Sequence, residues 1–161
     1  MKAIFLDIDG VLNNILHIVL LADKILGKEQ YLQLFRACKE TPFDYRSCKL
    51  MQQLISETNA KVILSSTWRL GKYRTELIQK YAGIKVDDKT PVLNTKRGEE
   101  IKCYLKEHPE ITHYVIIDDD LDFLDEQKKN LCHVDRNSGF SEKNYKKCLE
   151  ILNNEKFNYI N

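Results

Sequence analysis

An apolar run at residues 3–6 is followed at once by two acids and a glycine, in the order Asp7-Ile8-Asp9-Gly10. A short apolar segment closed by turn residues is typical of a strand buried on both faces of a parallel sheet. Side chains two residues apart project to the same side of an extended chain, so Asp7 and Asp9 can converge. Two carboxylates at the end of a buried strand are costly unless a cation or another partner meets them. This end of the strand is therefore the first candidate for a functional site.

The residue types of this turn suit phosphoryl transfer. Gly10 lets the backbone turn sharply and approach a ligand closely. Mg²⁺, a hard cation that prefers oxygen ligands, would relieve the repulsion between Asp7 and Asp9. One carboxylate can attack phosphorus and form an acyl-phosphate, while a second protonates the leaving group and later activates water. The simpler alternative is a surface turn in which both acids face solvent.

Two later apolar segments, at residues 61–64 and 113–117, also end in polar side chains. The first leads into hydroxyl and arginine side chains, namely Ser65, Ser66 and Arg69. These groups suit an anionic, oxygen-rich ligand. The alternative interpretation is that the hydroxyl side chains only cap a helix. The second leads into an acidic run, namely Asp118, Asp119, Asp120 and Asp122. Repulsion between these carboxylates makes such a run unfavourable without a cation. The alternative is a loop in which the acids are solvated.

Helical segments alternate with the apolar ones along the chain. We expect helices at about residues 14–26, 29–39, 73–81, 99–107 and 142–152, a fourth strand at 131–134 and an irregular stretch at 84–96. A further helix, capped by Asp44 or Ser47, is expected to reach about residue 57. This alternation predicts an α/β fold, a doubly wound, three-layer, Rossmann-like parallel sheet with helices on both faces. Ligands bind beyond the carboxyl ends of such strands, so Asp7, Ser65 and Asp118 are expected at one site.

The helix expected at residues 14–26 is apolar on almost every side. A helix of this kind is usually buried or meets a partner, and we expect it to pack into the core. Its apolar run at residues 15–22 is too short to span a bilayer, so no membrane association is expected.

Length and composition favour one ordinary globular domain at residues 1–161, with 43% hydrophobic and 30% charged residues. The net charge of +1 provides no global field that would attract nucleic acid or an anionic membrane. The five cysteines include no Cys-x-x-Cys pair. This spacing argues against a disulfide framework or a zinc site, and favours a reducing, cytoplasmic location. No oligomeric state is predicted.

The motifs resemble those of the haloacid dehalogenase-like (HAD) superfamily of aspartate-based phosphatases over nearly the whole chain. The run from Asp7 to Val11 is similar to its first motif, although Val11 stands where threonine is common. Residues 62–65 are similar to its second motif, and residues 118–119 are similar to its fourth. The third motif is a single basic residue, either Arg97 or Lys96. Residues 64–69, 97–101 and 117–120 are similar to small HAD members associated with RNA-repair enzymes.

The resemblance implies a role for each site residue. Asp7 would attack phosphorus, and Asp9 would act as general acid and then as general base. Ser65, Ser66 and Arg69, with Arg97 or Lys96, would bind the phosphate and the substrate. Mg²⁺ would be held by Asp7, the main-chain carbonyl of Asp9 and Asp118, with help from Asp119 or Asp122.

The implied function is a Mg²⁺-dependent phosphomonoester hydrolase with an aspartyl-phosphate intermediate, and nucleic-acid 3′-phosphate ends are the favoured substrate. The helical segment at about residues 13–58 is a candidate insert or small cap, too short for the large caps of many small-metabolite phosphatases. One alternative is a small-metabolite or nucleotide phosphatase of the same superfamily. Another is a phosphate-accepting signalling module, which is disfavoured because the Asp-x-Asp pair comes first here and the acidic run last.

Overall fold

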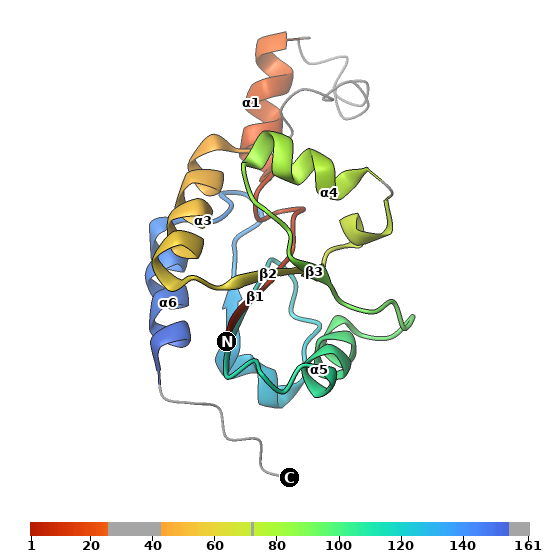
Figure 1. Ribbon diagram of the computed structural model, residues 1–161. Helices are drawn as coiled ribbons and strands as arrows, with labels where there is room; N and C mark the ends of the chain where they lie inside the picture. The colour runs from red at the N-terminus through yellow and green to blue at the C-terminus, as the bar shows by residue number, and fades with distance from the viewer. Residues whose placement is uncertain (26–42, 72, 155–161) are drawn as a thin grey trace.

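The computed structural model describes residues 1–25, 43–71 and 73–154 (Figure 1). Within these ranges one parallel sheet of five strands has the order β3-β2-β1-β4-β5. The strands are β1 (Lys2–Leu6), β2 (Lys61–Leu64), β3 (Asp88–Lys89), β4 (His113–Asp118) and β5 (Leu131–His133). The strand that precedes Asp7 is thus the central one, with β2 and β4 on either side, and the predicted parallel sheet is confirmed.

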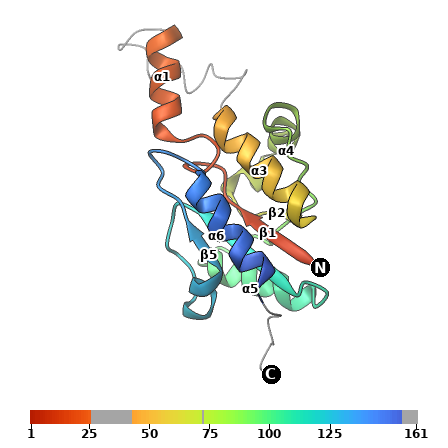
Figure 2. The ribbon, with the colours of Figure 1, turned by 90° about the vertical axis from the view of Figure 1, so that its left-hand side faces the viewer.

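Helices cover both faces of the sheet (Figures 1 and 2). One face carries α3 (Tyr45–Thr58) and α6 (Glu142–Asn153), and the other carries α5 (Arg97–Glu107). Alternate residues of β1 face the two sides, because Ile4 and Leu6 belong to one buried cluster and Ala3 and Phe5 to the other. The three-layer arrangement predicted from the sequence is therefore confirmed.

Several helix boundaries follow from capping side chains. Asp44 begins α3 by accepting the Ser47 N–H at 2.9 Å, and α3 ends at Asn59 in the left-handed conformation. Ser141 begins α6 in a reciprocal arrangement with Asn144. Two short 3₁₀ elements, η2 (Thr67–Leu70) and η4 (Asp125–Asn130), follow the loops after β2 and β4.

Three elements differ from the sequence-based expectation. The helix expected at residues 73–81 is a short α-helix, α4 (Arg74–Leu77), which continues as a π-helix, η3 (Ile78–Ala82). Residues 84–96 contain β3, which pairs with the end of β2 and is too short to show an apolar pattern. The helix α5 begins at Arg97, two residues before the predicted start.

The apolar helix after the first turn is α1 (Ile15–Ile25), and it projects beyond the carboxyl ends of the strands (Figure 2). The expectation that it packs into the core is wrong, since the side chains of Leu16 and Leu20 are more than half exposed. The carbonyls of Arg136 and Asn137 accept the N–H groups of Ile15 and Leu16, which fixes the start of α1 above the sheet.

The proposed insert at 13–58 remains a prediction. The helix expected at residues 29–39 lies outside the described residues. Within the insert, α3 buries Met51 and Leu54 against the sheet. Nowhere in the described ranges is there a helix with both the length and the apolar character that crossing a bilayer requires.

Candidate active site

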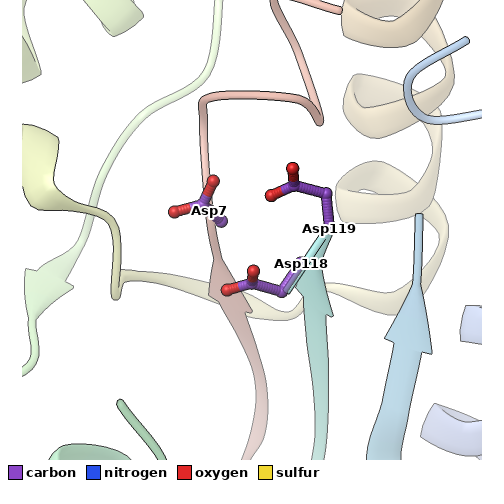
Figure 3. Close-up of side chains that lie close together, drawn as sticks. All are labelled: Asp7, Asp118 and Asp119. Atoms are coloured by element: carbon purple, nitrogen blue, oxygen red, sulfur yellow. The ribbon is translucent and has the colours of Figure 1, made fainter. Parts of the chain in front are cut away.

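Three carboxyl groups gather where β1 and β4 end (Figure 3). The parallel register places Leu6 opposite Ile117, and the Asp7 N–H donates to the Ile117 carbonyl at 3.0 Å. Asp7 therefore lies beside Asp118. One oxygen from each of Asp7, Asp118 and Asp119 lies within 4.8 Å of the other two. Asp7 and Asp118 are buried, so their charges are poorly solvated.

An open pocket of about 320 Å³ lies over these carboxylates. It is lined by Asp7, Asp9, Gly10, Asn13, Ile15, Ile18, Thr67, Arg97, Asp119, Asp120 and Arg136. The polar lining comes from the loops after β1 and β4, from the first residue of η2, from the start of α5 and from the loop before α6, while α1 supplies two apolar side chains. The site is thus at the carboxyl edge of the sheet, where a doubly wound fold is expected to bind ligands.

The basic residue at this site is Arg97. Its Nη1 lies 2.8 Å from Asp7 Oδ1 and also donates to Asp118 Oδ2. The side chain of Lys96 is 72% exposed, and its Nζ lies 4.0 Å from Asp122 Oδ1. Of the two candidates for the third motif, the structure therefore brings only Arg97 to the carboxylates.

Close packing of Gly98 fixes the position of Arg97. A Cβ atom on Gly98 would lie 2.8 Å from the backbone N of Leu124 and 3.0 Å from the Cα of Phe123. The buried Gln127 side chain donates to the Gly98 carbonyl at 2.8 Å and accepts the Leu124 N–H at 3.1 Å. The first turn of α5 is consequently held against the loop that follows β4, with Arg97 directed at the acids.

Negative charge in the site is not fully compensated by Arg97. Burial and the neighbouring charge of Asp118 raise the pKa of Asp7 to about 8, against the opposing effect of Arg97. Burial also raises the pKa of Asp118 to about 6, although Arg97 favours its charged form. Carboxylate oxygens are the ligands that Mg²⁺ prefers, and a spread within 4.8 Å can be bridged by one ion. The donor set at this site therefore fits Mg²⁺.

Asp9 lies in the same pocket but has different partners. Its carboxylate accepts the Asn13 side-chain amide at 2.7 Å and the Trp68 indole N–H at 3.0 Å. Gly10 has a φ of +80°, and a Cβ there would lie 2.5 Å from Asp119 Oδ2. Glycine is thus required both by the backbone conformation and by the close approach of Asp119.

The two serines after β2 lie in the same layer as Asp7. The Ser65 N–H donates to the Leu6 carbonyl at 3.1 Å, so Ser65 follows β2 at the level where Asp7 follows β1. The Ser65 hydroxyl is buried and has no hydrogen-bond partner within the described ranges. Ser66 Oγ accepts the Trp68 N–H at 3.4 Å and so caps η2.

Two of the predicted residues are directed elsewhere. Arg69 does not line the pocket, because its guanidinium donates to the carbonyls of Ser65 and Ser66 and to Glu100 Oε2 at 2.5 Å. The Asp122 side chain is half exposed and lies outside the group of three carboxylates. Of Asp119 and Asp122, the structure therefore places only Asp119 with the other acids.

Sequence reasoning missed several residues of this site. Arg136 lines the pocket and donates to Asp119 Oδ2 from Nε at 2.9 Å and from Nη2 at 2.8 Å. It lies between β5 and α6, where no motif marks it. Asn13 also lines the pocket and donates to Asp9, whereas its neighbour Asn14 caps α1 by accepting the His17 N–H at 2.8 Å.

This combination of a doubly wound sheet, an Asp-x-Asp pair after its central strand and an acidic pair after the neighbouring strand defines a HAD-like protein. The chain belongs to the family described as the HAD domain in Swiss Army Knife RNA repair proteins, whose model matches residues 3–145. Membership of this family supports a hydrolase, typically a phosphatase. Comparison with curated proteins and with solved structures finds no match to this chain.

Proposed function

We propose that the protein is a Mg²⁺-dependent phosphomonoester hydrolase that forms an aspartyl-phosphate on Asp7. One observation carries this proposal. The buried Asp7 carboxylate faces an open pocket, within 4.8 Å of carboxylate oxygens of Asp118 and Asp119 and 2.8 Å from Arg97 Nη1. A nucleophile, a metal-binding acid pair and a fixed positive charge thus converge on one position.

Asp7, Asp118 and Asp119 are the residues that would hold Mg²⁺, together with the main-chain carbonyl of Asp9. When bound, the ion supplies positive charge that offsets both the carboxylates and the phosphoryl oxygens. The burial of Asp7 and Asp118 supports this assignment, because uncompensated buried carboxylates are costly.

The chain's own residues carry the chemical steps. An Asp7 carboxylate oxygen attacks phosphorus, the bond from phosphorus to the leaving oxygen breaks, and the proton of Asp9 passes to that oxygen. In the second step Asp9 takes a proton from water, the water oxygen attacks phosphorus, and inorganic phosphate leaves Asp7. Arg97 offsets charge on the phosphoryl oxygens, and the Ser65 hydroxyl, which has no partner among the described residues, donates a hydrogen bond to one of them.

The substrate proposed is a phosphorylated nucleic-acid end, with a 3′-phosphate of RNA as the first candidate. The family description, which refers to RNA repair proteins, supports this class of substrate. The pocket is open, and the exposed Arg136 side chain on its lining adds positive charge beside the carboxylates. A terminal phosphate could therefore enter while the rest of a polynucleotide stays outside.

The test is release of inorganic phosphate, first from 4-nitrophenyl phosphate and then from 3′- and 5′-phosphorylated RNA oligonucleotides. We expect turnover with Mg²⁺, none with EDTA and none in Asp7→Asn. Asp125→Asn is the matched control, because Asp125 is exposed on η4 and pairs only with Lys128 among the described residues. Preference for small phosphate esters over both RNA ends would favour the small-metabolite alternative. Full activity in Asp7→Asn would contradict the proposed nucleophile.

A further inference from the structure

The single tryptophan of the chain contacts the carboxylate that is proposed to transfer the proton. The indole N–H of Trp68 lies 3.0 Å from each of the two Asp9 carboxylate oxygens. Trp68 belongs to η2, which follows the second motif, whereas Asp9 belongs to the first. The hydrogen bond therefore links two strand ends that together form one side of the site.

Contacts other than Asp9 fix the orientation of the indole. The ring centroid of Trp68 lies 5.5 Å from that of Phe43, and the guanidinium carbon of Arg74 lies 5.4 Å from the Trp68 ring. Ser66 accepts the backbone N–H of the same residue. Because these contacts hold the ring and its backbone, the indole N–H is a preorganised donor and does not depend on Asp9 for its position.

The partners of Asp9 differ in charge from those of the other three acids. Asp7 and Asp118 contact Arg97, and Asp119 contacts Arg136. Among the described residues, the side chains that donate to Asp9 are those of Trp68 and Asn13, and both are neutral. Neutral donors fix the direction of a carboxylate without forming an ion pair with it, so these contacts are suited to orienting Asp9.

We propose that Trp68 is a positioning residue that holds Asp9 for proton transfer to the leaving oxygen. This inference rests on the proposed phosphatase function. As Asp7 attacks, the bond from phosphorus to the leaving oxygen breaks with its electron pair on that oxygen. The Asp9 proton passes to the same oxygen, which leaves an alcohol, an Asp9 carboxylate and phosphorylated Asp7. Trp68 contacts neither phosphorus nor the leaving group and acts only through Asp9.

This role predicts a dependence on the leaving group that a purely structural role does not. An alkoxide is a poor leaving group and needs the proton, whereas a dinitrophenolate leaves without one. Loss of the indole N–H should therefore slow hydrolysis of alkyl phosphates and spare that of activated aryl phosphates. The kcat/KM value is the appropriate quantity, because it covers the steps up to phosphorylation of Asp7 and not the later hydrolysis.

The experiment compares Trp68→Phe with the wild type on β-glycerophosphate and on 2,4-dinitrophenyl phosphate, both with Mg²⁺. We expect kcat/KM to fall about tenfold or more on the alkyl ester, the usual effect of losing a hydrogen bond to a charged group, and less than about twofold on the aryl ester. Tyr145→Phe is a matched control, because it removes one hydrogen-bonding atom from an aromatic side chain on the face of α3 and α6. Both substrates should be hydrolysed by this control as by the wild type.

A second substitution preserves the test if phenylalanine disturbs the fold. Because the chain has one tryptophan, an isosteric analogue with sulfur in place of the indole N–H can be incorporated at position 68 alone. Equal losses on the two esters, or no loss on either, would overturn the role of Trp68. A wild-type protein with no Mg²⁺-dependent turnover of either ester would instead overturn the proposed function itself.

Discussion

The guanidinium of Arg97 lies between two buried acids, donating to Asp7 at 2.8 Å and also to Asp118. The charges of these acids raise the pKa of Arg97 despite its burial, so Arg97 is charged at any pH used for an assay. The cation therefore opposes the rise in the pKa of Asp7 and fixes one positive charge beside the position where phosphorus would be attacked.

Replacing Arg97 should impair catalysis far more than replacing its neighbour. We expect Arg97→Ala to lower kcat/KM by about 10²–10³, the usual loss when one preorganised donor to a developing charge is removed. Lys96→Ala should change kcat/KM by less than about threefold, because exposed charges contribute little. Steady-state kinetics on an aryl phosphate would measure both, and a larger loss in Lys96→Ala would assign the third motif to Lys96.

Asp119 and Asp122 should differ in their effect on the metal. Asp119 belongs to the group of three carboxylates and Asp122 does not, so we expect Asp119→Asn to raise the Mg²⁺ concentration for half-maximal activity by about 10–100-fold. Asp122→Asn should leave that concentration nearly unchanged. Titrating Mg²⁺ into each variant tests this, and the reverse order would show that Asp122 supports the ion.

Stabilisation by Mg²⁺ should grow as the pH rises. In the unfolded chain the pKa of Asp7 is about 3.9, whereas burial and the charge of Asp118 raise it to about 8 in the folded, metal-free protein. The folded state thus binds the extra proton, and the contribution of Asp7 to folding stability is greatest below about pH 4 and is lost as the pH rises to about 8. Because Mg²⁺ replaces that proton, it should raise the unfolding temperature more at about pH 9 than at about pH 5.

Thermal unfolding in Mg²⁺ and in EDTA at several pH values measures this difference. Asp7→Asn should remove most of the pH dependence of the Mg²⁺ effect. An increase in unfolding temperature that is the same at both ends of the pH range would contradict metal binding through Asp7.

Gly98 should be intolerant of a side chain. A Cβ there would collide with the backbone of Leu124, so we expect Gly98→Ala to lower the free energy of unfolding by about 1–3 kcal/mol, the usual cost of overpacking. The substitution should also lower kcat through displacement of Arg97. Gly71→Ala is the matched control, because the three atoms nearest to its Cβ would all belong to the Arg74 side chain and none to the backbone. Equal stability of the two variants, measured by denaturant unfolding, would contradict the close packing at Gly98.

The sequence predicted the sheet and its acidic edge because these depend on local patterns. Apolar runs gave the strands, and the parallel register then placed Asp7 beside Asp118. The choice between Arg97 and Lys96 could not be made, because adjacent residues on a helix point in different directions and the start of α5 was misplaced by two residues.

Long-range partners were the main features that local patterns could not show. Arg69 had the character of an anion ligand, but Glu100 in α5 pairs with it and holds it beneath the site. The position of α1 depends on carbonyls from the loop before α6, so its apolar composition alone wrongly suggested burial. The contact of Trp68 with Asp9 joins residues far apart in the chain and had no sequence signal of its own.

The most direct test of the account is to find which residue carries the phosphoryl group during turnover. The protein would be quenched while it hydrolyses an aryl phosphate with Mg²⁺, reduced with borohydride and digested for mass spectrometry. We predict homoserine at position 7, the reduction product of an aspartyl-phosphate, in the wild type and not in Asp7→Asn or in EDTA. A modified residue at Asp118, Asp119 or Ser65, or turnover with no covalent product, would contradict the account.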